Sequence, residues 1–288
     1  MLITLKDMMG IAEKEKIAIG GFNTPNLASL EAVIGAAEEE KLPVILMFAE
    51  CHDEWVSLDL IGPAMLKAAK QATVPVCVHL DHGEHLEYLK KALELGFTGI
   101  MYDGSVLPYE ENVTNTKKAV EMAKKYGASV EAELGSMGRR ESGANDRSGD
   151  CDETKIYTDP NLAAEFVSET GIDLLACSFG TTHGIYLKEP KLDLGIVRRV
   201  RNITNDMPVV MHGGSGVSRD DYHAVIQAGV RKINYFTYMD KAGGSGAKKH
   251  LDSLAPDAPQ FYSSVFLAAR DEMKENVIHA IRMFALKE

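Results

Sequence analysis

Short apolar runs recur along the chain, and stretches with helical spacing of apolar residues separate them. The runs lie at about residues 17–22, 43–49, 75–81, 98–103, 128–133, 173–179, 208–212 and 231–236. Several contain almost no polar residue, which is typical of parallel strands buried on both faces. Between them, residues 26–40, 84–95 and 109–126 repeat apolar residues every three or four positions, so they are predicted helices.

The alternation of eight such strands with helices, without a Ser/Pro-rich linker, favours one closed barrel over two domains. We therefore expect an α/β fold, a (β/α)8 TIM barrel, over residues 1–288 as a single domain. Residues 136–157 are rich in glycine, serine and charge, as in a mobile active-site loop or a disordered segment. Residues 240–262 look partly loop-like, and residues 263–286 are a predicted C-terminal helix.

Charge and composition exclude several classes of partner. The net charge of −11 argues against a nucleic-acid surface, although a small anionic substrate needs only a local positive pocket. No apolar stretch approaches the roughly 18 residues of a membrane span, and the charged N-terminal residues do not form a secretory signal. The four cysteines are widely spaced and form no CxxC pair, which is typical of reduced thiols in a cytoplasmic protein.

Three histidines follow apolar runs directly, each beside a glycine: His82, His183 and His212. In a β/α barrel the C-terminal ends of the strands meet at one face. Three neutral imidazoles with one open position are a common catalytic zinc shell, whereas a lone histidine is more often hydrogen-bonded or solvated. His79 is expected to pack inside the barrel. The remaining histidines singled out here should be solvated: His85, His223, His250 and His279.

Carboxylates reach the same predicted face. Asp81 is expected either to exchange a proton with a substrate hydroxyl or to orient a histidine ligand. Asp103 and Glu133 end the next two runs, where they could hold a second cation or neutralise nearby lysines and arginines. Glu131 lies deeper in its run and should have a partner, since an unpaired buried charge is costly.

The last two runs end in residues suited to an anion. The sequence His-Gly-Gly-Ser-Gly begins at His212, and Asn234 is followed three residues later by Thr237. Loops after the seventh and eighth strands of a β/α barrel commonly bind phosphate through backbone N–H groups. A plain turn is the alternative for the glycine-rich segment alone.

Taken together, the motifs resemble the class II, metal-dependent ketose-bisphosphate aldolases, the fructose- and tagatose-bisphosphate aldolase family. The matching segments occur in family order over residues 1–237, and the last fifty residues match poorly. They are Gly20-Gly21-Phe22-Asn23, His79-Leu80-Asp81-His82-Gly83, Tyr102-Asp103-Gly104-Ser105, Val130-Glu131-Ala132-Glu133-Leu134-Gly135, Gly180-Thr181-Thr182-His183-Gly184, His212-Gly213-Gly214-Ser215-Gly216 and Lys232-Ile233-Asn234.

The resemblance implies roles for individual residues. The three histidines would bind Zn²⁺, and Asp81 would exchange the proton of the C4 hydroxyl. Asp103 and Glu133 would lie beside the metal, at a second divalent or monovalent cation, and Glu141 would move the proton at the donor carbon. The residues implied around the phosphorylated sugar are Asn23, Gly184, Gly213, Gly214, Ser215, Asn234 and Thr237.

The implied reaction breaks or forms the C3–C4 bond of a phosphorylated ketose, giving dihydroxyacetone phosphate and an aldehyde. Zinc would stabilise the enediolate, so no lysine Schiff base is required. Two alternatives remain. A metal-dependent barrel hydrolase often has His-x-His on its first strand, which is absent here. A non-catalytic sugar-phosphate-binding barrel would be expected to lose Asp81 or the metal ligands.

Departures from the family pattern leave the substrate open. Met47 and Ala49 replace a glutamine and a serine, and Glu50-Cys51-His52 follows them. Phe236 replaces a polar residue, and Arg139-Arg140 replaces the Gly-Gly that usually precedes the loop acid. One of these arginines could replace the missing contact to a distal phosphate. By analogy with related barrels, we expect a homodimer or homotetramer.

Overall fold

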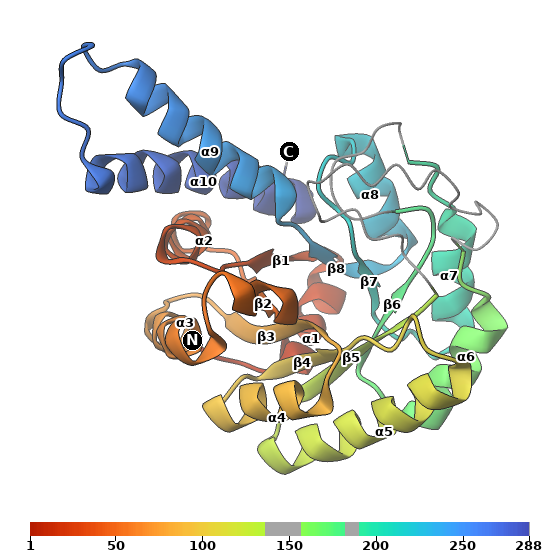
Figure 1. Cartoon of the computed structure of the whole chain (residues 1–288). Coiled ribbons are helices and arrows are strands. Elements are labelled where there is room, and N and C mark those ends of the chain that lie inside the picture. Colours follow the sequence, from red (N-terminus) through yellow and green to blue (C-terminus); the bar gives the residue numbers. More distant parts are fainter. Residues whose placement is uncertain (136–156, 182–189, 288) are drawn as a thin grey trace.

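A computed structural model describes residues 1–135, 157–181 and 190–287 of the chain. Its strands are parallel and form a closed barrel in the order β1-β2-β3-β4-β5-β6-β7-β8, which confirms the predicted (β/α)8 fold (Figure 1). The strands are β1 (Ile19–Asn23), β2 (Val44–Ala49), β3 (Val76–Gly83), β4 (Gly99–Tyr102), β5 (Ser129–Leu134), β6 (Leu174–Cys177), β7 (Val209–Met211) and β8 (Val230–Asn234).

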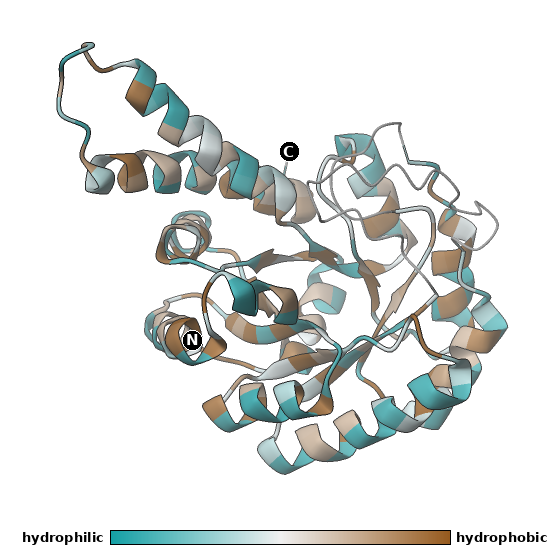
Figure 2. Cartoon of the chain, in the orientation of Figure 1, coloured by the Kyte–Doolittle hydropathy of each residue, from teal (hydrophilic) through white to brown (hydrophobic). Residues whose placement is uncertain are grey.

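Helices surround the barrel and connect its strands (Figure 1). They are α1 (Leu5–Glu15), α2 (Leu27–Glu40), η1 (Glu50–Glu54, 3-10), α3 (Leu58–Gln71), α4 (Leu86–Leu95), α5 (Tyr109–Tyr126), α6 (Pro160–Thr170), α7 (Leu194–Ile203), α8 (Arg219–Ala228), α9 (Thr237–Asp252) and α10 (Tyr262–Phe284). Hydrophobic residues dominate the strands, and α4 and α5 carry hydrophilic outer turns (Figure 2). Within the described residues, no helix combines the length and apolar character needed to cross a bilayer.

Helix α1 closes the N-terminal end of the barrel. A capping box between Thr4 and Asp7 starts this helix, and Leu5, Met8 and Ala12 on its apolar face are fully buried. Leu5 and Met8 join an apolar cluster with residues of the barrel interior, including Ile45 and Met47. This apolar layer leaves the opposite, C-terminal end of the strands as the open end of the barrel.

The C-terminal region differs from the sequence expectation. Residues 240–252 belong to α9, although the glycines between 243 and 246 suggested a loop. A Cβ atom on Gly243 would lie 2.1 Å from Met273 Cε, and one on Gly246 would lie 2.4 Å from the Ala268 carbonyl oxygen. Glycine therefore permits close packing against α10, and that tertiary contact outweighs its weak helix propensity. The predicted terminal helix is confirmed as α10.

Helices α9 and α10 form a hairpin that projects from the barrel, as Figure 1 shows.

The close contact between α9 and α10 can be tested at two glycines of α9. Gly246→Ala should destabilise the protein by about 1–3 kcal/mol, because the added methyl group collides with backbone. Gly244 is exposed and has nothing within 4 Å of a Cβ position, so Gly244→Ala should be neutral or stabilising by up to about 1 kcal/mol. Chemical unfolding of both variants checks this, and equal destabilisation would contradict the packing argument.

Candidate active site

Two histidine rings meet at the C-terminal end of the barrel. His82 lies near the end of β3, and His212 directly follows β7. His82 Nε2 and His212 Nδ1 are 3.0 Å apart, and the rings are nearly perpendicular, at 88°. Two nitrogens bound to one tetrahedral zinc ion at about 2.0–2.1 Å would be about 3.3 Å apart. The observed separation is close to that value, and without an ion it also permits a hydrogen bond between the two rings.

A local irregularity explains how the neighbouring residues Asp81 and His82 both reach this site. Strict alternation along a strand would direct their side chains to opposite faces. The register between β3 and β4 shifts between Leu80 and Gly83, and His82 adopts φ 43° in the left-handed region. Such bulges redirect a side chain, here turning the His82 ring toward His212.

Each imidazole is held through its other nitrogen. His82 Nδ1 is 2.8 Å from Asp103 Oδ2, and His212 Nε2 is 2.8 Å from Glu131 Oε1. Asp103 is fixed in turn by Ser105, whose hydroxyl and backbone N–H both donate to Oδ1. Carboxylates in these positions set the orientation and basicity of metal-binding histidines.

Glu131 has the partner that the sequence required. Its second oxygen, Oε2, accepts a hydrogen bond from Lys232 Nζ at 2.7 Å, and both side chains are fully buried. Burial raises the pKa of Glu131, but Lys232 and His212 outweigh it and lower that pKa to about 2. His79 packs in the same interior region, 3.5 Å from Glu131, as predicted. Burial and the Lys232 charge lower the pKa of His79 to about 3.

The electrostatic field around His82 favours positive charge. Burial lowers its pKa, but Asp81 and Asp103, with Glu133, outweigh burial and raise the pKa to about 10. The negative charges that favour a proton on His82 would also stabilise a metal cation bound to its ring.

Asp81 is buried and held as an anion by two amides. Asn23 Nδ2 donates to one carboxylate oxygen at 2.9 Å, and Asn234 Nδ2 donates to the other at 3.0 Å. Burial raises the Asp81 pKa, but His82, His212 and Lys232 bring it below its ordinary value. The Oδ1 atoms of both asparagines are buried and have no hydrogen-bond partner within the described chain. They can therefore accept a hydrogen bond from a bound hydroxyl group.

Two groups of side chains could hold a cation among the described residues. One consists of Asp81, His82 and His212, and the other of His82, Asp103 and Glu133; in each, the ligand atoms lie within 4.8 Å of one another. The second group shares His82 with the first. Asp103 and Glu133 thus lie beside the histidine pair, and a second cation between them stays a prediction.

The loops after β7 and β8 contact each other. The Gly214 N–H donates to the Asn234 carbonyl, and the Phe236 N–H donates to Ser215 Oγ at 3.2 Å. Gly213 and Gly216 have φ values of 63° and 86°, which favour glycine. Thr237 is the first residue of α9, so a helix N-terminus, whose first N–H groups lack partners within the helix, adjoins this loop pair.

Some predicted site residues lie outside the described residues: His183, Gly184, Glu141, Arg139 and Arg140. Two features of the site were missed from the sequence. Lys232 gave a usable signal, because a lysine inside an apolar strand must find a buried partner. His52 is 4% exposed and stacks on Trp55, whereas the sequence marked it only as a departure from a pattern.

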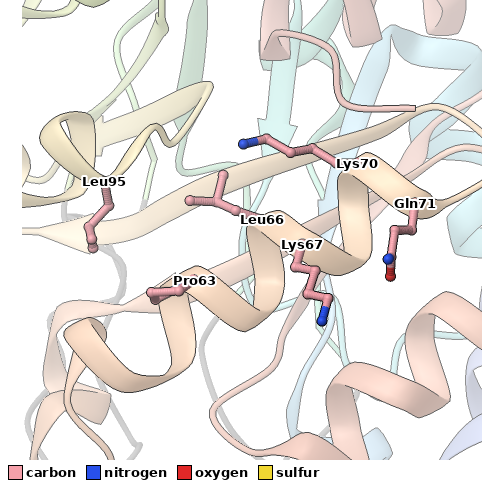
Figure 3. Close-up of a pocket in the computed structure, with 6 residues that line it drawn as sticks. All are labelled: Pro63, Leu66, Lys67, Lys70, Gln71 and Leu95. Atoms are coloured by element: carbon pink, nitrogen blue, oxygen red, sulfur yellow. The ribbon is translucent and has the colours of Figure 1, made fainter.

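A separate pocket of about 500 Å³ lies on the outside of the barrel (Figure 3). It is lined by Pro63, Leu66, Lys67, Lys70 and Gln71 of α3 and by Leu95 of α4. None of the residues at the barrel mouth borders it.

Known proteins resemble this chain over nearly its whole length. The family model "Fructose-bisphosphate aldolase class-II" matches residues 3–288. The "Probable fructose-bisphosphate aldolase" of Bacillus subtilis (strain 168) is 39% identical over 287 residues, covering 98% of this chain and 97% of that protein. The "Fructose-bisphosphate aldolase" of Geobacillus stearothermophilus is 39% identical over 288 residues, covering 98% and 96%. The crystal structure of the YdjI aldolase from Escherichia coli K12 superposes with a TM-score of 0.86 and 35% identity, covering 99% of this chain and 97% of that one.

The buried Lys232–Glu131 pair can be tested by mutation. Lys232→Met should cost about 3–5 kcal/mol of folding stability, because it leaves the Glu131 charge buried without its cation. It should also weaken metal binding by about 10- to 100-fold, since Glu131 orients His212. Adding Glu131→Gln to this variant should recover stability but not metal affinity. Unfolding curves and competition with a chromogenic chelator measure both quantities, and full metal affinity in Lys232→Met would contradict the positioning role.

Proposed function

Because the chain belongs to the class II fructose-bisphosphate aldolase family and is therefore a carbon–carbon lyase, we propose that its substrate is a phosphorylated ketose. Cleavage of the C3–C4 bond would give dihydroxyacetone phosphate and an aldehyde, and condensation would reverse it. The observation that carries this proposal is the convergence of His82 Nε2 and His212 Nδ1 beside the anionic carboxylate of Asp81.

Zinc is the metal that best fits the residues present. The family is metal-dependent, and paired imidazole nitrogens with carboxylates behind them suit zinc. His82 and His212 would hold it, with His183 as the proposed third ligand. When bound, zinc would act as a Lewis acid that stabilises negative charge on the oxygens of the donor fragment. Asp103 and Glu133 are proposed to adjoin a second divalent or monovalent cation.

Asp81 is proposed to act as the base in cleavage. It would take the proton of the C4 hydroxyl while the C3–C4 bond breaks and the C4 oxygen becomes the aldehyde carbonyl. Its two hydrogen bonds from Asn23 and Asn234 hold the carboxylate in a fixed orientation and in its charged form. Glu141 is proposed to deliver the proton that the donor carbon then needs.

The donor phosphate is proposed to bind between the loops after β7 and β8. Ser215 and Thr237 offer hydroxyl groups there, and the N-terminus of α9 offers backbone N–H groups. Gly213, Gly214 and Gly184 would let the phosphate approach the backbone closely.

The cellular setting is also a proposal. Buried free thiols at Cys77 and Cys177 suit a reducing cytoplasm, and the acidic composition gives no reason to expect a nucleic-acid or membrane partner. We propose a homodimer or homotetramer, supported by Phe261 and Tyr262, which are exposed on the projecting hairpin.

Removal of the metal tests the role assigned to the histidines. Dialysis against a chelator should abolish cleavage of ketose phosphates, and stoichiometric Zn²⁺ should restore it. Zn²⁺ should also raise the unfolding temperature of the metal-free protein, because it binds only the folded site. Undiminished cleavage by protein shown to be metal-free by elemental analysis would exclude the proposed role.

Substitution of Asp81 should separate the two halves of the reaction. Asp81→Ala should lower kcat for ketose cleavage by about 10²- to 10⁴-fold, because the base is lost. Exchange of the donor-carbon hydrogen of dihydroxyacetone phosphate with solvent deuterium should persist, because Glu141 is assigned to that step. NMR follows the exchange, and a coupled assay follows cleavage. The matched control is Asp59→Asn, at an exposed acid on α3, which should leave both activities unchanged. Parallel loss of cleavage and exchange in Asp81→Ala would refute the assignment.

A further inference from the structure

Three aromatic side chains from distant parts of the chain form one group, named here the aromatic wall: His52, Trp55 and Phe236. The His52 and Trp55 rings are stacked, with centroids 4.5 Å apart and planes at 18°. The centroid of the Phe236 ring lies 5.1 Å from that of His52 and 6.3 Å from that of Trp55. His52 is 4% exposed, whereas Trp55 is 64% exposed, so the wall has a buried base and an open face.

The aromatic wall lies at the barrel mouth beside the proposed base. Strands β2 and β8 both pair with β1, so the segments that follow them meet over the C-terminal end of β1. Ala49, the residue before η1, is in register with Asp81. Phe236 lies two residues after Asn234, which donates to Asp81, and its own N–H donates to Ser215. The wall therefore adjoins both the base and the proposed phosphate loop.

The Nδ1 atom of His52 is available for a ligand at this position. This atom is buried and has no hydrogen-bond partner within the described chain. Burial lowers the pKa of His52 to about 4 despite the nearby Asp81 carboxylate, so the ring is neutral near pH 7. The Nδ1 atom of a neutral imidazole can form a hydrogen bond with a hydroxyl group, but the ring carries no charge that would neutralise a phosphate.

The charged residues of η1 also favour an uncharged ligand. This helix, Glu50–Glu54, contains three carboxylates and no lysine or arginine. Glu50 accepts hydrogen bonds from the backbone N–H groups of Glu84 and His85, and Asp53 accepts from Tyr88. These acids are engaged by the neighbouring α4 region, where the His85 ring also pairs with Glu50, its Nδ1 2.6 Å from Oε1. The helix therefore supplies no lysine or arginine that could bind a phosphate beside the wall.

We propose that the aromatic wall is the subsite for the aldehyde half of the substrate and that it selects an uncharged hydroxyaldehyde. The carbon chain of the aldehyde packs on the open face of Trp55, and one of its hydroxyl groups bonds to His52 Nδ1. The preferred ketose then carries one phosphate, on the donor end, rather than two. This inference rests on the proposed function, because it specifies the substrate of the same reaction.

Matched substrates test the charge preference. The zinc-loaded protein should cleave fructose or tagatose 1-phosphate with a kcat/KM at least about tenfold higher than the corresponding 1,6-bisphosphate. Using both sugars removes dependence on the configuration at C4. A preference for the bisphosphates would overturn the inference. If Arg139→Ala/Arg140→Ala then abolished that preference, those arginines would hold the distal phosphate instead.

Variants of the wall test its residues. Trp55→Ala should raise the KM for the aldehyde in condensation by about tenfold, with little change for dihydroxyacetone phosphate. Trp55 is mostly exposed, so this change leaves the core intact. His52→Phe should keep the ring packing but lose the hydrogen bond, and His52→Gln should restore part of the selectivity for hydroxylated over deoxy aldehydes. Tyr126→Ala, at an exposed aromatic residue at the C-terminal end of α5, is the control.

Deuterium exchange into dihydroxyacetone phosphate distinguishes the two possible failures. It requires no aldehyde, so it should be unchanged in the Trp55 and His52 variants. Absence of exchange and of cleavage in the unmodified protein would refute the proposed function itself. Normal exchange together with unchanged aldehyde KM and selectivity in both Trp55→Ala and His52→Phe would refute only the aromatic wall as a subsite. If His52→Phe unfolds, Trp55→Ala alone decides.

Discussion

The buried ion pair between Lys232 and Glu131 is the interaction on which the architecture of the site depends. Both side chains are fully buried in the barrel, where an isolated charge is very costly. The pair is tolerated because Glu131 also binds His212, so that each oxygen of the carboxylate has a partner. Strands β5 and β8 contribute Glu131 and Lys232, and His212 directly follows β7. Closure of the barrel is what brings the three together.

This arrangement gives the barrel a gradient from apolar to charged. Helix α1 and the apolar cluster around Ile45 close the N-terminal end. The Lys232–Glu131 pair comes next along the axis, and the mouth holds His82 and His212 with the Asp81 carboxylate. Charges at the mouth are therefore supported by fixed partners from below, and little reorganisation is needed when charge develops in a reaction.

The mouth is asymmetric around its rim, and this asymmetry separates the proposed donor and aldehyde sides. The loops after β7 and β8, with the start of α9, offer N–H and hydroxyl groups suited to an anion. The side over β1 and β2 offers aromatic surface and one neutral nitrogen, from His52. A substrate with phosphate at one end and hydroxyl groups at the other matches that division.

The sequence by itself determined the strands, the barrel and which polar residues end the strands, because buried parallel strands and the residues at their ends follow from local patterns. His82, His212 and Asp81 were identified in this way, and so was the need for a partner to Glu131. Tertiary structure alone decided that this partner is Lys232, 101 residues away, since only barrel closure sets which side chains meet. It also decided the turn of His82 toward His212, which depends on the register shift between β3 and β4. Close packing on α10 made α9 helical despite its glycines, because such contacts are not encoded in local propensity.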